Sequence, residues 1–248
     1  MRIYCPDEII REGTIVISSK KEIRHMAMVL RLKNGDVVEV FDGKSAEYKC
    51  KIKSLSKDKA ELAILGRKQF LSSNALQLTL ACAIPKKAKM DFIVEKATEL
   101  GVDTIIPLHT HRTIVELSGE RAEHRLQRWQ AIAKEASQQC GRIKLPMVEA
   151  VAEFSDIVKR IKEYDMALIP YLGAGNQHIK DVAFKKGRKS ILVFIGPEGD
   201  FSEEEIALAK ENGCHGISLG ELTLKVDTAA IAVVAFLKFS YYQAREFR

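Results

Sequence analysis

The chain has 248 residues and a net charge of +6, with 46% hydrophobic and 29% charged residues. This balance is that of an ordinary globular protein and excludes a largely disordered chain. Its longest apolar run, residues 229–237, is far shorter than the roughly 20 residues that a membrane-spanning helix needs, and the polar start MRIYCPDEII lacks the apolar core of a signal peptide. We therefore expect a cytoplasmic protein of one large or two unequal domains, with no membrane partner.

The first stretch predicts a small β domain over residues 1–70. Residues 14–65 contain short alternating segments such as DVVEVFD and AEYKCKIKSL, separated by Asn-Gly and Asp-Gly turn signals. One helical interruption is expected in KKEIRHMAMVLRL, where apolar residues recur at helical spacing. The polar stretch GRKQFLSSN, residues 66–74, is expected to be a linker.

Basic residues concentrate in this first domain. Residues 1–70 contain 15 lysines and arginines against 10 acidic residues, whereas the remainder of the chain is nearly balanced. A polyanion such as RNA could be held there through its phosphates. A basic surface that is merely solvated explains the charge equally well.

Residues 75–248 alternate strands with amphipathic helices, which predicts an α/β domain with a doubly wound, mostly parallel sheet covered on both faces. In chain order we expect the strand LQLTLACAI, the helix KMDFIVEKATELG, the strand VDTIIPL, a long helix over 120–139, the helix FSDIVKRIKEY, the strands DMALIPYL and SILVFIG, the helix EEEIALAKEN, the strand HGISLG and a last helix from about Thr228. Ligands of such sheets bind beyond the carboxyl ends of the strands.

Three of these strand ends carry turn signals that favour a ligand site. They are Ile169–Gly173, Ile195–Gly199 and Leu219–Glu221. In the middle turn, Gly196 and Gly199 permit close approach of a ligand or an unusual backbone torsion, while Pro197 stiffens the loop. Ser202 and Glu205 then have the spacing of a capping box that starts the next helix. A stiff connector that holds no ligand is the alternative reading of this turn.

Signatures of other chemistries are missing from the sequence. It contains no GxxxxGK[ST], GxGxxG, HExxH or nucleophile elbow. The five cysteines lie at least 32 residues apart without a CxxC pair, and His109 and His111 have no acidic or thiol neighbour in the sequence, so we predict neither a disulfide nor a metal site. Backbone-rich loops joined to a basic module instead indicate a cofactor site that serves a nucleic-acid substrate.

Several segments carry a resemblance to a known family. In KMDFIVEKATELGVDTIIPL, EASQQCGR, VFIGPEGDFSEEEI, LGELTLKVDTAAI and HMAMVLRLKNGDVVEVFDG, the chain resembles the ribosomal RNA small subunit methyltransferase E family of the SPOUT superfamily. The resemblance implies methylation of N3 of one uridine in 16S rRNA of the small ribosomal subunit, with S-adenosyl-L-methionine as cofactor. It also implies a PUA-like, RNA-binding β-barrel at the front, a SPOUT domain with a trefoil knot behind it, and a homodimer.

The same resemblance assigns roles to individual residues. The residues expected to bind the cofactor are Ile169, Tyr171, Leu172, Gly196, Pro197, Glu198, Gly199, Leu219, Gly220, Leu224 and Thr228. Arg112 and Lys225 are expected to be catalytic. Contacts to the substrate RNA are expected from Arg24, Arg31, Gln139 and Arg142.

One segment departs from the family pattern. Where the family usually reads LGxRILRxETA, this chain reads LGELTLKVDTA, so that Leu222 and Lys225 replace two arginines and Asp227 replaces a glutamate. Lysine keeps the charge but loses the planar fork of arginine, and leucine keeps neither. Two alternatives therefore stay open: a SPOUT methyltransferase that acts on another RNA, and a non-catalytic RNA-binding or ribosome-assembly protein.

Overall fold

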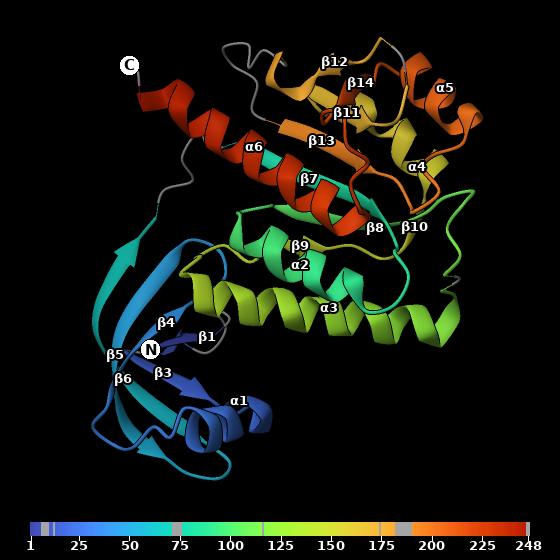
Figure 1. Cartoon of the computed structure of the whole chain (residues 1–248). Helices are drawn as coiled ribbons and strands as arrows, with labels where there is room; N and C mark the ends of the chain where they lie inside the picture. The colour runs from blue at the N-terminus through green and yellow to red at the C-terminus, as the bar shows by residue number, and fades with distance from the viewer. Residues whose placement is uncertain are drawn as a thin grey trace. The chain divides into compact units, whose positions relative to one another are not determined.

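The computed structural model describes residues 1–5, 10–11, 13–70, 76–115, 117–173, 175–181 and 190–246, with side chains up to Tyr242 (Figure 1). The chain divides into two compact units, of which the first comprises residues 1–73 and 137–145 and the second comprises residues 74–136 and 146–248. Within the described ranges, no helix is both long enough and apolar enough to cross a bilayer.

The first unit is built on a six-stranded sheet with the order β1-β4-β5-β6-β3-β2. Its strands are β1 (Arg2–Tyr4), β2 (Ile10–Arg11), β3 (Thr14–Ile17), β4 (Val37–Phe41), β5 (Ala46–Leu55) and β6 (Ala60–Gln69). All neighbours are antiparallel except β1 and β4. Between β3 and β4 the chain forms helix α1 (Lys20–Arg24), which continues as a π-helix over His25–Val29. The expected small sheet with one helical interruption is confirmed.

Alternation of side chains explains the core of this unit. Along β5 the buried residues are Ala46, Tyr48, Cys50 and Ile52, and they pack with Ile23 and Met26 of the helical segment. The expectation of a linker from residue 66 is wrong for residues 66–69, because β6 continues through them as the partner of β5. Residues 71–74 of that expected linker lie outside the described residues.

A segment distant in sequence completes the first unit. Residues 137–145 comprise the last residues of α3 (Gly119–Cys140) and the loop that follows. The amide of Leu145 donates to the carbonyl of Gly43 over 3.0 Å. The side-chain amide of Gln138 donates to the carbonyl of Arg2 over 3.4 Å. The first unit is therefore discontinuous in sequence.

The second unit contains a parallel sheet with the order β10-β8-β7-β13-β11-β14-β12, and β9 pairs with β8. Its strands are β7 (Gln77–Ala83), β8 (Thr104–His109), β9 (Met147–Val148), β10 (Ala152–Glu153), β11 (Met166–Pro170), β12 (Gln177–His178), β13 (Ser190–Ile195) and β14 (His215–Ser218). The central strands are buried on both faces, as their continuous apolar runs predict.

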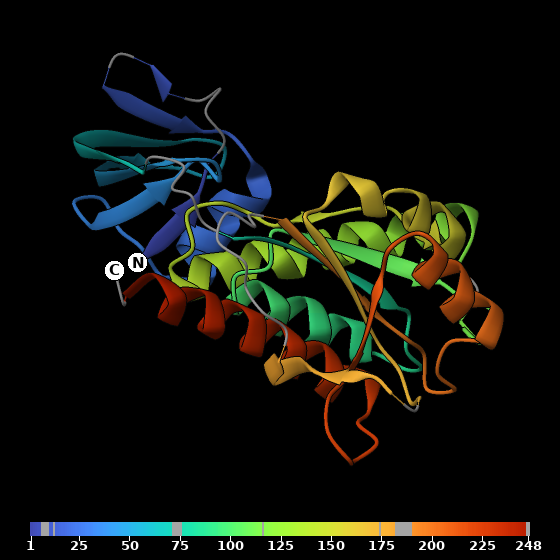
Figure 2. The ribbon, with the colours of Figure 1, turned by 90° about the horizontal axis from the view of Figure 1, so that it is seen from above.

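Helices cover both faces of this sheet (Figure 2). One face packs against α2 (Lys89–Glu99), α3 and α6 (Val226–Glu246), which contribute Ile93, Trp129 and Val233 to the core. The other face packs against α4 (Phe154–Lys159) and α5 (Glu203–Glu211). The predicted α/β class with a covered parallel sheet is confirmed, whereas the trefoil knot stays a prediction.

The strand order places three loops side by side. Strands β13, β11 and β14 are consecutive neighbours in the sheet and run parallel. Their carboxyl ends therefore meet at one edge, although the strands are far apart in sequence. The loops that leave this edge begin at Tyr171, Gly196 and Leu219.

Candidate active site

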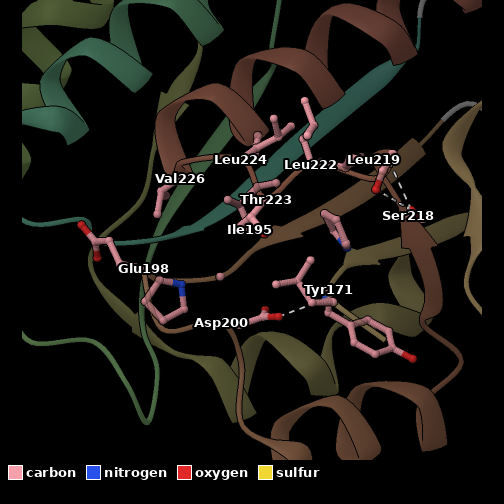
Figure 3. A pocket seen from close by; sticks show the side chains of 16 residues that line it. Tyr171, Ile195, Glu198, Asp200, Ser218, Leu219, Leu222, Thr223, Leu224 and Val226 are labelled. Atoms are coloured by element: carbon pink, nitrogen blue, oxygen red, sulfur yellow. Dashed lines mark hydrogen bonds between the residues drawn. The ribbon is translucent and has the colours of Figure 1, made fainter. Parts of the chain in front are cut away.

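A pocket lies where these three loops meet (Figure 3). Its lining residues are Pro170, Tyr171, Leu172, Ile195, Gly196, Pro197, Glu198, Asp200, Ser218, Leu219, Gly220, Leu222, Thr223, Leu224, Val226 and Ala229. Apolar side chains such as Ile195, Leu224 and Val226 form its walls. The pocket thus combines a hydrophobic lining with loops that expose main-chain atoms, which is the usual composition of a small-molecule site.

Most of the expected cofactor residues come together here. Tyr171, Leu172, Gly196, Pro197, Glu198, Leu219, Gly220 and Leu224 all line the pocket. The other three do not line it: Ile169 is fully buried in the core behind it, Thr228 is exposed on α6, and Gly199 faces Arg112. Pro170 and Ile195 also line the pocket and lie within the predicted turns, whereas the sequence reasoning missed Asp200, Ser218, Leu222, Thr223, Val226 and Ala229 as cofactor residues. Their position beside the three turn motifs was the available signal.

Asp200 fixes the loop after β13. Its Oδ2 accepts a hydrogen bond from the amide of Leu172 over 3.0 Å, and its Oδ1 accepts one from the amide of Phe201 over 2.8 Å. Asp200 also has φ of 59°, in the left-handed region that aspartate tolerates better than most residues. One carboxylate therefore holds the loops after β11 and β13 together, as the dashed line in Figure 3 shows.

Of the two roles expected for the glycines of this loop, an unusual backbone torsion is wrong, whereas close approach of a ligand stays a prediction. Neither Gly196 nor Gly199 has a positive φ, so the unusual torsion belongs to Asp200. A Cβ atom on Gly196 would lie 3.1 Å from the ring of Phe201, which is tighter than ordinary van der Waals contact. A side chain at Gly196 would therefore crowd Phe201, and Gly196 itself lines the pocket.

Arg112 ties the same loop to the loop after β8. Its Nη1 donates to the carbonyl of Gly199 over 2.6 Å and lies 3.4 Å from the carbonyl of Phe201. A charged donor on a carbonyl makes a stronger hydrogen bond than a neutral one. These contacts fit a side chain that positions the cofactor loop, whereas the sequence suggested a catalytic group.

The expected capping box is confirmed at the start of α5. Ser202 Oγ accepts from the amide of Glu205 over 3.2 Å, and Glu205 Oε2 accepts from the amide of Ser202 over 2.9 Å. The other oxygen of Glu205 accepts from the amide of His111 over 2.9 Å. The cap thereby fixes the far end of the cofactor loop and also contacts the loop after β8.

The segment that joins β7 to α2 contacts two acidic residues, of which Glu198 lines the pocket and Asp227 follows the lining residue Val226. Glu198 Oε1 accepts a hydrogen bond from the amide of Lys86 over 3.0 Å. Lys89 Nζ lies 2.9 Å from Asp227 Oδ1 at the start of α6. The hydrogen bond from Lys89 is the main reason that the pKa of Asp227 lies below its usual value. Asp227, which stands where the family has glutamate, therefore serves as the partner of a lysine.

Some main-chain groups of the pocket lack partners. The amides and carbonyls of Leu219 and Leu224 make no hydrogen bond with any residue that the structure describes. An adenine ring presents both donors and acceptors on its edge and apolar faces above and below. Because Leu219 and Leu224 offer the complementary groups within an apolar pocket, the residues present fit the adenosyl part of S-adenosyl-methionine.

Two residues of the segment that departs from the family pattern, residues 219–229, lie at the rim of this pocket. Leu222 lines it yet is 79% exposed. Lys225 is exposed between Leu224 and Val226, which both line the pocket. The two replaced arginine positions therefore border the site without belonging to the core, so substitution there is tolerated by the fold.

The four expected RNA contacts belong to the first unit and are described apart from the pocket. Arg24 borders a groove whose other lining residues include Lys20, Lys33 and Lys57 beside apolar Met28 and Leu55. Arg31 and Gln139 are exposed. Arg142 donates from Nε to the carbonyl of Lys144, and its own carbonyl accepts from Arg2.

One expectation about histidines needs correction. His109 has an acidic partner after all, because its Nδ1 lies 3.2 Å from Glu153 Oε2 on the neighbouring strand β10. The sequence hid this contact, since the two residues are 44 positions apart. Among the described residues, no group of three or more histidine, cysteine or acidic side chains is arranged to hold a metal ion.

Comparison with known proteins shows which family the chain resembles. Residues 72–238 match the family model for the RNA methyltransferase domain, and residues 19–65 match the model for the RNA methyltransferase PUA domain. Similar curated proteins include two named ribosomal RNA small subunit methyltransferase E. The one from Bacillus subtilis is 28% identical over 93% of this chain and 92% of its own length. The one from Synechocystis is 30% identical over 94% of this chain and 75% of its own length.

Two solved structures share the whole fold. A protein from Legionella pneumophila, determined with bound S-adenosyl-methionine, is 30% identical, with a TM-score of 0.88 over 96% of this chain and 97% of its own. A ribosomal RNA small subunit methyltransferase E from Neisseria gonorrhoeae, bound to S-adenosyl methionine, is 29% identical, with a TM-score of 0.85 over the same shares. Both comparisons cover the two units.

Proposed function

The chain belongs to the RNA methyltransferase family, and from that premise we propose that it transfers the methyl group of S-adenosyl-methionine to N3 of one uridine in the 16S rRNA of the small ribosomal subunit. The observation that carries the proposal is the pocket beyond β11, β13 and β14, with its apolar walls and with main-chain groups of Leu219 and Leu224 that no described residue pairs with. The relatives that bind S-adenosyl-methionine support the choice of cofactor.

The chemistry requires little of the protein beyond placement. The cofactor, when bound, supplies a methyl group already activated on a sulfonium. The loops from Tyr171, Gly196 and Leu219 orient it, while Arg112 and Asp200 hold the middle loop in place. The protein would align N3 of the uridine with that methyl group. After the N3 proton is lost to water, the N–C bond would form as the S–C bond of the sulfonium breaks, and the thioether product would leave.

Lys225 is the cation that we propose to act on the base. Its side chain is exposed and stands between two pocket-lining residues, which leaves it available to a nucleotide at the rim. A positive charge there would stabilise the anion that uridine forms on losing its N3 proton. Arg112 is bound to main-chain carbonyls, so we propose that it acts through the loop.

We propose that residues 1–70 form the RNA-binding domain and residues 75–248 the cofactor-binding and dimerising domain. The basic groove at Arg24 supports the first assignment, because lysine and arginine bind RNA chiefly through phosphates. Arg31, Gln139 and Arg142 are proposed as further contacts. The protein would meet its ribosomal substrate in the cytoplasm.

Exposed aromatic side chains support the proposed homodimer. Phe92 on α2 is 46% exposed, and Phe239 and Tyr242 on α6 are 59% and 52% exposed. Large apolar side chains on neighbouring helices are typical of surfaces that bury against a partner. Light scattering should then give twice the mass of the chain, and a Phe239→Glu substitution should lower that mass to one chain.

Transfer of a labelled methyl group tests the function. The purified protein is incubated with labelled S-adenosyl-methionine and, in separate reactions, with 30S subunits that lack the modification, with 16S rRNA that lacks it, and with tRNA, and the methylated nucleoside is mapped. The proposal expects N3-methyluridine at one position. Methyl transfer only to tRNA would support action on another RNA. Cofactor binding without transfer to any of these RNAs would support a non-catalytic RNA-binding protein.

A further inference from the structure

The loop between β7 and α2 borders the cofactor pocket and carries two lysine side chains that the proposed mechanism does not use. Together with the first residue of α2, Lys89, it reads Ile-Pro-Lys-Lys-Ala-Lys over residues 84–89. Strand β7 lies between β8 and β13, so this loop leaves the same edge of the sheet as the cofactor loop. Its lysines therefore stand at the same edge of the sheet as the cofactor pocket.

Two contacts anchor this lysine loop, residues 84–89. At one end the amide of Lys86 donates to Glu198, and Figure 3 shows Glu198 at the margin of the pocket, away from Leu219 and Leu222. At the other end Lys89 pairs with Asp227. Both acidic residues belong to segments that form the cofactor site, so the lysine loop is tied to that site at both ends.

The backbone between the anchors is held in an uncommon conformation. Lys87 has φ of 62°, in the left-handed region that a non-glycine residue with a long side chain rarely adopts. Such a torsion persists only where the surrounding structure imposes it, and it often marks functional segments. The two anchors supply that constraint.

The lysines of this loop differ in whether an acidic side chain neutralises their charge. The ammonium of Lys89 is neutralised by Asp227. The side chains of Lys86 and Lys87 are exposed and form neither hydrogen bonds nor ion pairs within the described part of the chain. Two unneutralised cations are thus presented next to the pocket by a loop whose backbone is fixed.

We propose that Lys86 and Lys87 bind backbone phosphates of the RNA strand that carries the target nucleotide. The inference rests on the proposed function, which supplies an RNA to this edge of the sheet. Lysine binds phosphate as a point charge, which suits contacts that hold a strand without reading its sequence. The flanking strand is thereby fixed while the target base enters the pocket.

The test compares two double variants that remove the same charge. Lys86→Gln with Lys87→Gln alters the lysine loop, and Lys159→Gln with Lys162→Gln alters exposed lysines that precede the amino end of β11, at the opposite edge of the sheet. Affinity for 16S rRNA is measured from 50 to 200 mM salt. Affinity for S-adenosyl-methionine is measured by calorimetry, and its retention shows that each variant is folded.

We expect the Lys86 and Lys87 variant to lose about fivefold in RNA affinity and the salt dependence of log K to become less steep by about 1.4, since each phosphate contact to a single strand contributes roughly 0.7. Cofactor affinity should stay within about twofold. A variant that matches the control pair in affinity and slope would overturn the inference while leaving the proposed function intact. Wild-type protein that fails to bind 16S rRNA would overturn both.

Discussion

The guanidinium of Arg112 lies 2.6 Å from the carbonyl oxygen of Gly199, although the two residues are 87 positions apart in the sequence. The same nitrogen lies 3.4 Å from the carbonyl of Phe201. Through these contacts the loop after β8 holds the loop that lines the cofactor pocket. These contacts support a positioning role for Arg112, and its expected catalytic role stays a prediction.

Replacing Arg112 should therefore affect cofactor binding more than turnover. In Arg112→Gln the charged hydrogen bond to Gly199 is lost, and we expect the KM for S-adenosyl-methionine to rise roughly tenfold, which corresponds to about 1.4 kcal/mol. The kcat should change less, and Arg112→Lys should recover part of the loss. Steady-state kinetics with saturating RNA measure both parameters. A large fall in kcat with an unchanged KM would instead restore the catalytic role.

Leu222 offers a gain-of-function test. Because its side chain is 79% exposed at the pocket rim, Leu222→Arg should leave the unfolding free energy within about 0.5 kcal/mol of wild type. The added charge should raise kcat/KM for RNA about fivefold. Leu222→Gln serves as the uncharged control. Equal kinetics for the arginine and glutamine variants would mean that the position does not meet the RNA.

The pair of Lys89 and Asp227 predicts a dependence of stability on pH. The pKa of Asp227 is lowered from 3.8, chiefly by its hydrogen bond to Lys89. A carboxyl with a depressed folded-state pKa stabilises the fold at pH values above its unfolded pKa and loses that effect as the pH falls through the folded pKa. Wild type should therefore exceed Asp227→Asn in unfolding free energy at pH 7, and the gap should close below about pH 4. A gap that is constant from pH 7 to pH 3 would contradict the assignment.

Thiol labelling should single out one cysteine. Cys5, Cys50, Cys82 and Cys214 are buried, whereas Cys140 is exposed. Burial raises the pKa of Cys50 to about 11 and that of Cys214 to about 12, and it also raises the pKa of Cys82, with smaller contributions from Glu198 and Asp227. Since the thiolate is the reactive form, iodoacetamide at pH 8 should modify Cys140 alone within minutes. Mass spectrometry counts the adducts. Modification of Cys82 at a similar rate would show that the sheet opens transiently around β7, the strand that contains Cys82.

Local patterns predicted much of the fold. The periodicity of residues 120–139 matches α3, and Ser202 with Glu205 forms the cap that their spacing indicates. Local rules failed where a distant partner decides the outcome. The polar composition of residues 66–69 predicted a linker, but these residues belong to strand β6 and pair with β5. The order of the strands in the sheet could not be predicted from the sequence either, because β13 pairs with β7 through residues that are more than 100 positions apart.

The candidate site shows the same division. The three turn motifs were visible because proline and glycine mark strand ends wherever they occur. Asp200 was missed because its two hydrogen bonds depend on how the loops after β11 and β13 approach each other. The contact of Arg112 with Gly199 depends on the same approach, so the sequence could suggest the residue but not its role.

The split of the first unit has a consequence for synthesis. Residues 1–70 leave the ribosome well before residues 137–145, which supply partners for the carbonyls of Gly43 and Arg2. At a synthesis rate of about 5–20 residues per second, residues 137–145 are made on the order of ten seconds after residue 70. The first unit is therefore completed while the second unit is still being translated. Cutting the gene between the two family matches would leave the front fragment without a segment that its native state contains.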